Sequence, residues 1–134
     1  MADYTQALKL DPEYEKAYYN RGLAYLDIGE LEQAVNDFSR TLQLDSSHAR
    51  AHYHRGRTLI LMERWEEAGG DFTRAIELDP TYANAYRRRG DVLVQLNRTE
   101  AALRDYQKAA ELLIQENEQD AAEKILDKIK DLQS

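Results

Sequence analysis

Residues 49–82 read ARAHYHRGRTLILMERWEEAGGDFTRAIELDPTY, and this stretch decides the fold because its pattern occurs three times. The other two copies are 15–48 and 83–116, so each unit is 34 residues long. Five of the positions that keep their residue type are Ala17, Ala51 and Ala85; Gly22, Gly56 and Gly90; Asp37, Asp71 and Asp105; Phe38, Phe72 and Tyr106; and Leu44, Leu78 and Leu112. A repeat of this length indicates an array of small units that stack on one another.

Each unit is predicted to form two helices. In the first unit, the apolar residues of 17–28 recur at helical spacing, and so do those of 31–42. Gly29 lies between the two stripes, where a glycine suits the end of a helix. Pro80 follows the second stripe of 49–82, and the residue before a proline is biased away from helical backbone. The sequence therefore predicts an all-α protein built from antiparallel helix pairs.

Charged residues recur on the packed side of these helices. An arginine precedes each repeated glycine, and an aspartate follows that arginine by sixteen residues: Arg21 and Asp37, Arg55 and Asp71, and Arg89 and Asp105. An ionised group on a packed helix face needs a partner, because its desolvation otherwise costs several kcal/mol. We therefore predict a half-buried ladder of Arg–Asp pairs, with Asp3 as a further partner of Arg21. The glycines are expected to let the two backbones of a helix pair approach closely.

Composition excludes several classes of function. The 134-residue chain carries a formal charge of −7, whereas nucleic-acid binders are normally basic. It has no cysteine, no phosphate-cradling glycine loop and no nucleophile beside a base, so we expect neither an enzyme nor a cofactor. Three histidines cluster at His48, His52 and His54 without a carboxylate at matching spacing, so we expect no metal site.

The location of the protein is a default expectation. No apolar run approaches membrane-spanning length, and the N-terminus does not have the plan of a signal peptide, so we expect a cytoplasmic protein without membrane contact. The opening residues MADYTQALKLDP match the second half of a unit. We therefore expect the chain to be a fragment of a larger protein.

The 34-residue pattern resembles the tetratricopeptide repeat (TPR). Residues 49–82 carry this resemblance best, with family positions filled by Gly56, Leu59, Ala68, Phe72, Ala75 and Pro80. The resemblance covers about residues 2–116 and implies a right-handed α-solenoid, the TPR-like superhelix of stacked helix pairs. The expected organisation is a single TPR domain over 1–134, made of the second helix of a truncated repeat at 2–14, full repeats at 15–48, 49–82 and 83–116, and a capping helix at 117–134.

The resemblance also implies where a partner binds, because in this family the first helix of each pair lines a concave groove. Six positions of each first helix lie opposite its packed stripe on a helical wheel. In this chain those eighteen positions hold five Lys or Arg and two Asp, a charge of +3 within an acidic protein. The peptide-binding residues that we predict are Lys16, Tyr19, Asn20, Arg50, Tyr53, His54, Arg57, Asn84, Arg87, Arg88 and Asp91.

A basic groove that carries tyrosines suits an extended acidic segment. Arginine binds carboxylates bidentately, and tyrosine packs against backbone and apolar side chains. The predicted function is a non-catalytic protein–protein interaction adaptor or scaffold. Family members that hold the C-terminal carboxylates of heat-shock chaperones use five groove positions, of which Arg88 alone fits, so that partner is not expected. The alternative is an assembly module that self-associates through an exposed side of the helix at 2–14.

Two features depart from the repeat pattern. Gly69 and Gly70 replace the Val35 and Asn36 of the first unit, and two interior glycines weaken a helix by about 2 kcal/mol. They are either neutral changes in a cooperative stack or an opening that receives a partner's side chain. Residues 117–134 do not fit the template and are expected to cap the last repeat. Their apolar stripe consists of Ala122, Ile125, Leu126, Ile129 and Leu132.

Overall fold

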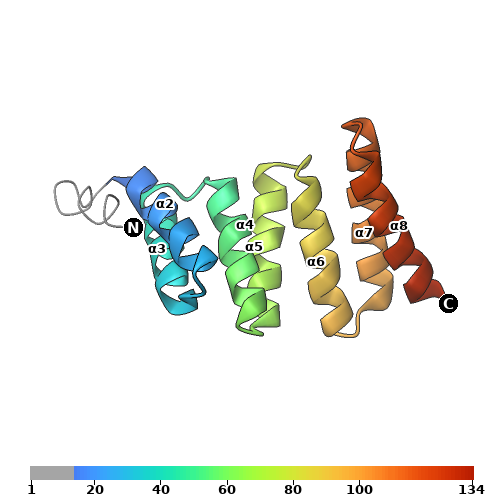
Figure 1. Ribbon diagram of the computed structural model, residues 1–134, viewed down its shortest axis with the longest axis horizontal. Helices are drawn as coiled ribbons and strands as arrows, with labels where there is room; N and C mark the ends of the chain where they lie inside the picture. Colours follow the sequence, from blue (N-terminus) through green and yellow to red (C-terminus); the bar gives the residue numbers. More distant parts are fainter. Residues whose placement is uncertain (1–13) are drawn as a thin grey trace.

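The computed structural model describes residues 14–134, which form helices without a strand (Figure 1). The helices are α2 (Glu15–Asp27), α3 (Leu31–Leu44), α4 (Ala49–Leu61), α5 (Trp65–Leu78), α6 (Ala83–Gln95), α7 (Thr99–Gln115) and α8 (Gln119–Gln133). The all-α fold predicted from the repeat is therefore confirmed. The predicted helix at 2–14 and the pairing of Asp3 with Arg21 lie outside the described residues. Within the described part, no helix is both long and apolar enough to cross a membrane.

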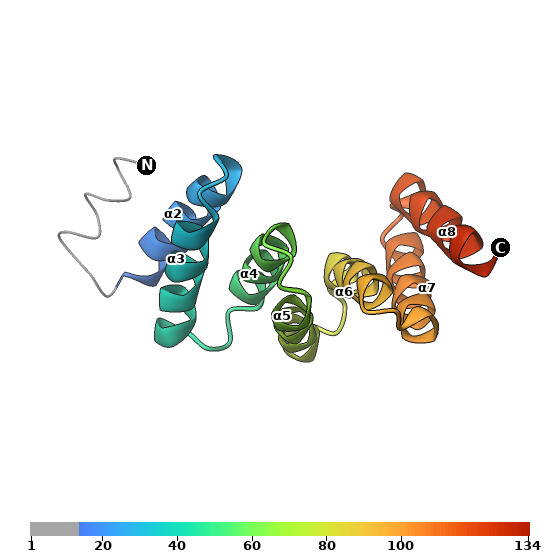
Figure 2. The ribbon, with the colours of Figure 1, turned by 90° about the horizontal axis from the view of Figure 1, so that it is seen from below.

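The helices are arranged as consecutive antiparallel pairs. Figures 1 and 2 show α2–α3, α4–α5 and α6–α7 one after another along the long axis, with α8 beside α7 at the C-terminal end. The first helices of the pairs also touch one another, because α4 contacts both α2 and α6. No comparable contact joins α3 to α5 or α5 to α7 in the described part of the chain. We call the row of first helices α2, α4 and α6, whose successive members touch one another, the inner row.

The second helices end at an aspartate turn. Asp45 follows α3, and its Oδ1 accepts hydrogen bonds from the Ser47 backbone N–H at 3.1 Å and the Ser47 hydroxyl at 2.7 Å. Asp79 makes the same two bonds with Thr81 after α5. The turn thus forms at Asp45 without the proline that follows Asp79. In the third unit Ile114 replaces this proline, and α7 continues to Gln115.

The turn within each pair requires left-handed backbone. Gly29 has a φ of 80°, as expected for the glycine that follows the first helix. Glu63 and Asn97 occupy the same place in the next two units, with φ values of 57° and 59°. Because a side chain is disfavoured in this conformation, the first unit alone uses the residue that the turn prefers.

The repeated glycines pack against aromatic rings. A Cβ placed on Gly22 or Gly56 would lie 2.8 Å from a ring carbon of Phe38 or Phe72, respectively. On Gly90 it would lie 2.6 Å from a ring carbon of Tyr106. Our expectation of direct backbone approach was therefore wrong in its detail. The space left by the missing Cβ is filled by the flat ring of the second helix, sixteen residues later in the chain.

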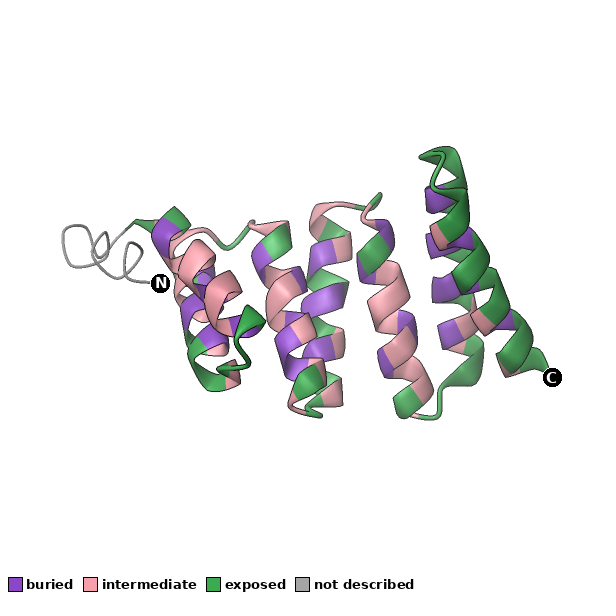
Figure 3. Ribbon diagram, in the orientation of Figure 1, coloured by how far each residue is buried: buried purple, intermediate pink, exposed green. Residues whose placement is uncertain are grey.

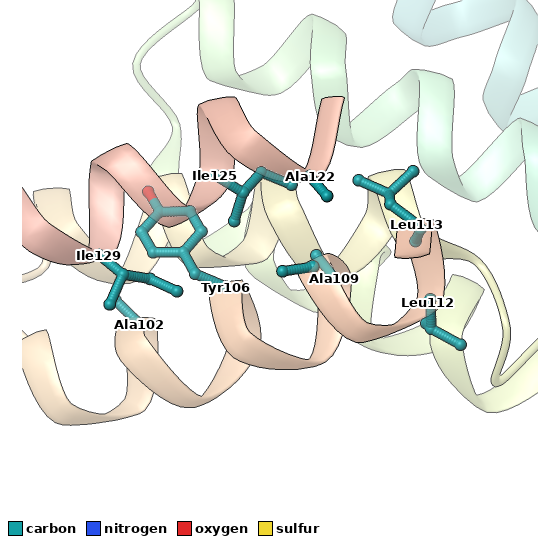
Figure 4. Packing of buried hydrophobic residues seen from close by; sticks show 10 residues of the cluster. Ala102, Tyr106, Ala109, Leu112, Leu113, Ala122, Ile125 and Ile129 are labelled. Atoms are coloured by element: carbon teal, nitrogen blue, oxygen red, sulfur yellow. The ribbon is translucent and has the colours of Figure 1, made fainter. Parts of the chain in front are cut away.

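Helix α8 covers the apolar side of the last pair. Ala122, Ile125 and Ile129 are buried in one cluster with residues of α7, including Tyr106 (Figure 4). Elsewhere in the stack, buried residues form bands on the sides of helices that face one another (Figure 3). Leu126 is 44% exposed, which corrects the prediction that it belongs to the covered stripe. It follows Ile125 directly and so points away from α7.

Candidate functional site

The predicted groove residues come from the inner row of helices, and most of them remain accessible. Lys16, Arg50 and Asn84 are exposed, and the half-buried members are Tyr19, Asn20, His54, Arg57, Arg87, Arg88 and Asp91. We call the surface that these side chains make on α2, α4 and α6 the inner wall. The remaining predicted residue, Tyr53, is buried.

His54 lies at the centre of the inner wall. Its ring is 5.0 Å from the Tyr53 ring, 6.0 Å from Tyr19 and 6.2 Å from Phe38, measured between centroids. Arg57 Nη1 is 3.3 Å from His54 Nδ1. Because arginine can only donate, neutral His54 accepts this hydrogen bond and carries its own proton on Nε2. Side chains of three neighbouring helices thus meet around one imidazole.

The surroundings of His54 disfavour its charged form. Burial is the main cause that lowers the pKa of His54 from 6.5 to about 4, and the electrostatic effects of Arg57, Arg50, His48 and Arg88 add to it. At neutral pH the imidazole is therefore uncharged. The side chains that act most strongly on it are arginines and a histidine, although the protein as a whole is acidic. The centre of the inner wall thus groups several arginines around a neutral imidazole.

Among the described residues, four inner-wall arginines have no acidic partner. Within residues 14–134, no ion pair joins a carboxylate to Arg50, Arg57, Arg87 or Arg88. Arg88 Nε makes a long hydrogen bond of 3.4 Å to the Tyr53 hydroxyl, and the buried Nε of Arg87 has no partner. An arginine that forms no ion pair can donate hydrogen bonds to a carboxylate without breaking an existing ion pair.

The ladder arginines are fully paired, and the predicted ladder is confirmed. Nε and Nη2 of Arg21, Arg55 and Arg89 donate to both carboxylate oxygens of the aspartate sixteen residues later, at 2.7–2.8 Å. Asp71 is buried, which disfavours its charge, but hydrogen bonds from Arg55 and His52 outweigh this effect and lower the pKa of Asp71. Arg55 also donates to Ser39, and Arg89 to Thr73, in the preceding unit. Sequence analysis missed these hydroxyls, although both units place one at the same repeat position.

Two of the predicted groove residues have structural roles instead. Tyr53 is 6% exposed because its ring packs on Phe72 and on Tyr82, with centroids 5.7 and 4.8 Å away. Asp91 accepts hydrogen bonds from the Tyr106 hydroxyl at 2.5 Å and from Lys128 Nζ at 3.0 Å. Their availability to a peptide is thus reduced, and Asp91 is neutralised by α8. Lys128 could not be foreseen because residues 117–134 do not follow the repeat template.

The three histidines have different surroundings and do not form one site. His48 caps α4 by accepting the Ala51 backbone N–H on Nδ1, at 3.1 Å. His52 Nδ1 lies 3.0 Å from Asp71 Oδ1, and His54 lies in the inner wall. In the part of the chain that the structure describes, no three side chains of metal-ligating type come together.

A second candidate surface lies at Gly69 and Gly70. A Cβ on Gly69 would make an ordinary contact with Val92 at 3.5 Å, and a Cβ on Gly70 would have no atom within 4 Å. A hollow of about 280 Å³ beside them is lined by apolar Val92, Leu93 and Leu96 and by charged rim residues. The absence of side chains at 69 and 70 therefore leaves an opening on α5, but no group in it identifies a ligand.

Comparison with known families shows which family the chain belongs to. Tetratricopeptide-repeat models match residues 19–83 and 72–104, and a TPR-repeat model matches residues 1–29. The chain is a tetratricopeptide-repeat protein. Proteins of this family are non-catalytic interaction modules, so this TPR chain is a protein-interaction scaffold and not an enzyme. No curated protein matches the sequence.

Solved structures agree with the TPR solenoid. The crystal structure of MamA has a TM-score of 0.78 at 24% identity, over 97% of this chain and 84% of that one. The second TPR of Spaghetti (RPAP3), bound to the HSP90 peptide SRMEEVD, has a TM-score of 0.72 at 28% identity, over 73% and 91%. The TPR2B domain of yeast Sti1 in a pHsp70 complex reaches 0.83 at 21% identity, over 89% and 95%. The MamA and Sti1 likenesses bear on the fold alone.

Proposed function

We propose that the inner wall of this TPR scaffold binds an extended acidic segment of a partner protein. The observation that carries the proposal is the contrast between two sets of arginines in one chain. The ladder arginines are each held by an aspartate, whereas Arg50, Arg57, Arg87 and Arg88 have none in the described residues. A partner's glutamates or aspartates would supply the missing carboxylates.

The energetics favour carboxylates over neutral ligands. A hydrogen bond between charged groups contributes about 1.5–3 kcal/mol when it is partly shielded from water. Tyr19, whose ring packs at a tilt against His48 with the centroids 4.6 Å apart, offers an aromatic surface beside the cations for the rest of the segment. The Spaghetti TPR was solved with a peptide that itself contains acidic residues, which supports acidic segments as a ligand class for this fold. The identity of the partner does not follow from this chemistry.

The test is a binding measurement with a fluorescent peptide of alternating glutamate and serine. The variant Arg57→Ala/Arg87→Ala/Arg88→Ala removes three inner-wall cations. The matched control Arg64→Ala/Arg74→Ala/Arg98→Ala removes three exposed arginines, one within α5 and one directly before each of α5 and α7, so both variants change the net charge equally. We expect the first variant to weaken binding about tenfold or more and the control to change it less than about threefold.

Two outcomes would count against the proposal. Equal losses in both variants would mean that the peptide responds only to net charge. Equal binding of a peptide in which lysine replaces every glutamate would mean that the inner wall does not select carboxylates. Binding should also weaken with added salt, because exposed charges are screened over about 8 Å at physiological ionic strength.

The alternative function, self-association through residues 2–14, depends on residues outside the described part of the chain. No observation in residues 14–134 favours it. Sedimentation velocity at several protein concentrations separates the two functions, since a monomer that binds the acidic peptide agrees with the first and a tight dimer that ignores it agrees with the second.

A further inference from the structure

The environment of His54 is unusual for a histidine at a surface that remains partly open. Helix α2 contributes Tyr19 and α3 contributes Phe38. Helix α4 and the turn before it contribute Arg50, Tyr53, Arg57 and His48, and α6 contributes Arg88. The charged and titratable groups that act most strongly on the imidazole are thus arginines and His48.

The hydrogen bond between Arg57 and His54 is incompatible with a protonated imidazole. Nδ1 accepts from Arg57 Nη1 at 3.3 Å only while Nδ1 has no hydrogen. If Nδ1 gains a proton from solvent, the two groups repel each other and Arg57 must turn away. A carboxylate placed between them removes the conflict, because it accepts one hydrogen bond from Arg57 and another from the new Nδ1–H.

We propose that His54, Arg57 and Arg88 form a carboxylate subsite, and that His54 takes up a proton when a partner's carboxylate enters it. This inference rests on the proposed function and specifies its central contact. The ligand class is a glutamate or aspartate side chain of an extended segment, held between α4 and α6. No other reactant is needed, since the proton comes from solvent and returns to it when the segment leaves.

The proton uptake follows from charge balance. The arginines that now repel a proton from His54 would be offset by the incoming negative charge, and the pKa of His54 would rise. A pKa that is higher in the complex than in the free protein means that binding tightens as pH falls. If the carboxylate restores the ordinary pKa of 6.5, affinity increases about tenfold between pH 7.5 and pH 5.5. Glutamate carboxylates remain ionised over most of that range.

The experiment measures the affinity of the alternating glutamate–serine peptide at pH 7.5 and pH 5.5, and the titration of the His54 ring by NMR with and without that peptide. The variant His54→Asn introduces the residue that the first unit carries at the same position, Asn20. The control His48→Asn removes the neighbouring titratable ring and keeps a residue that caps helices well. Circular dichroism confirms that each variant is folded.

We expect the wild type and His48→Asn to bind about threefold to tenfold more tightly at pH 5.5, with an upward shift of the His54 titration in the complex. His54→Asn should bind with nearly the same affinity at both pH values. The subsite is refuted if the His54 titration is unchanged by the peptide, or if His54→Asn keeps the full pH dependence. If the subsite is refuted but Arg57→Ala/Arg87→Ala/Arg88→Ala still weakens peptide binding, the proposed function stands. If the peptide does not bind the wild type, both proposals are overturned.

Discussion

Arg55 and Asp71 are joined by two parallel hydrogen bonds, from Nε at 2.8 Å and from Nη2 at 2.7 Å, that link α4 to α5. The same geometry occurs in the pairs on either side, so one rung joins the two helices of every unit. This relationship separates two uses of arginine in the chain. Arginines of the ladder join the two helices of each unit, whereas those of the inner wall form no ion pair within the described residues.

The first prediction concerns the ladder. Asp71→Leu should lower the free energy of unfolding by about 3 kcal/mol, because it leaves the charge of Arg55 without its partner on a packed face. The double change Arg55→Leu/Asp71→Leu should cost less than the single change, since neither charge then remains. Urea unfolding of the wild type, both single variants and the double variant gives the comparison. Equal losses in the single and double variants would show that solvent already screens the pair.

The second prediction concerns the pH dependence of stability. His54 has a folded pKa of about 4 against an ordinary value of 6.5, so the unfolded chain binds the proton more readily between these values. The contribution of neutral His54 to the free energy of unfolding is therefore fully present above pH 6.5 and is lost as pH falls toward 4. Allowing for the part of the ring that solvent reaches, we expect a loss of about 2 kcal/mol. Thermal unfolding from pH 7.5 to 4 should show a smaller decline for His54→Asn, and parallel curves for the two proteins would contradict the assignment.

The third prediction contrasts two glycines. Gly56→Ala should destabilise the protein by about 1–3 kcal/mol, because the new Cβ would meet the Phe72 ring at 2.8 Å. Gly70→Ala should stabilise it by up to about 1 kcal/mol, because alanine favours the helix and no atom lies within 4 Å of the added Cβ. Chemical denaturation measures both. Stabilisation by both changes would mean that helix propensity, and not ring packing, governs the repeated position.

The repeat made much of this fold predictable. The Gly and Asp positions recur at a fixed interval, so the helix pairs and the pairing of Arg55 with Asp71 follow from spacing alone. The turn at Asp45 was less evident, because it lacks the proline that marks the turn at Asp79. The packing partner of Gly56 could not be predicted from the pattern. Spacing shows that two helices meet there, but it does not show whether an aromatic ring or the backbone of the second helix contacts the glycine.

The inner wall was less predictable than the fold. A helical wheel places Tyr19, Tyr53 and Arg87 at one repeat position, yet Tyr53 is buried and the other two are half-buried, because the residues around them differ. Tyr53 is buried against Tyr82, whereas Tyr19 packs at a tilt against His48 and stays half-buried. The lowered pKa of His54 was also hidden, since it arises from side chains of several helices that only the fold brings together.

The fourth prediction tests the role of α8. Ile125→Ala should cost about 2–4 kcal/mol, because Ile125 is 1% exposed and fills the space against α7. The neighbouring change Leu126→Ala should cost less than about 1 kcal/mol, because Leu126 is 44% exposed. Thermal and urea unfolding of the two variants provide a matched pair. A larger loss for Leu126→Ala would mean that the other side of α8 is the one covered in solution.

The most direct measurement is the position at which an acidic peptide binds. Titration of isotope-labelled protein with the alternating glutamate–serine peptide, followed by amide NMR, reports every affected residue. Binding at the inner wall predicts saturable shifts at Asn20, Arg57 and Arg88 and little change at the exposed Thr73 and Arg74 of α5. Shifts confined to α3 and α5, or none on α2, α4 and α6 at saturating peptide, would contradict it.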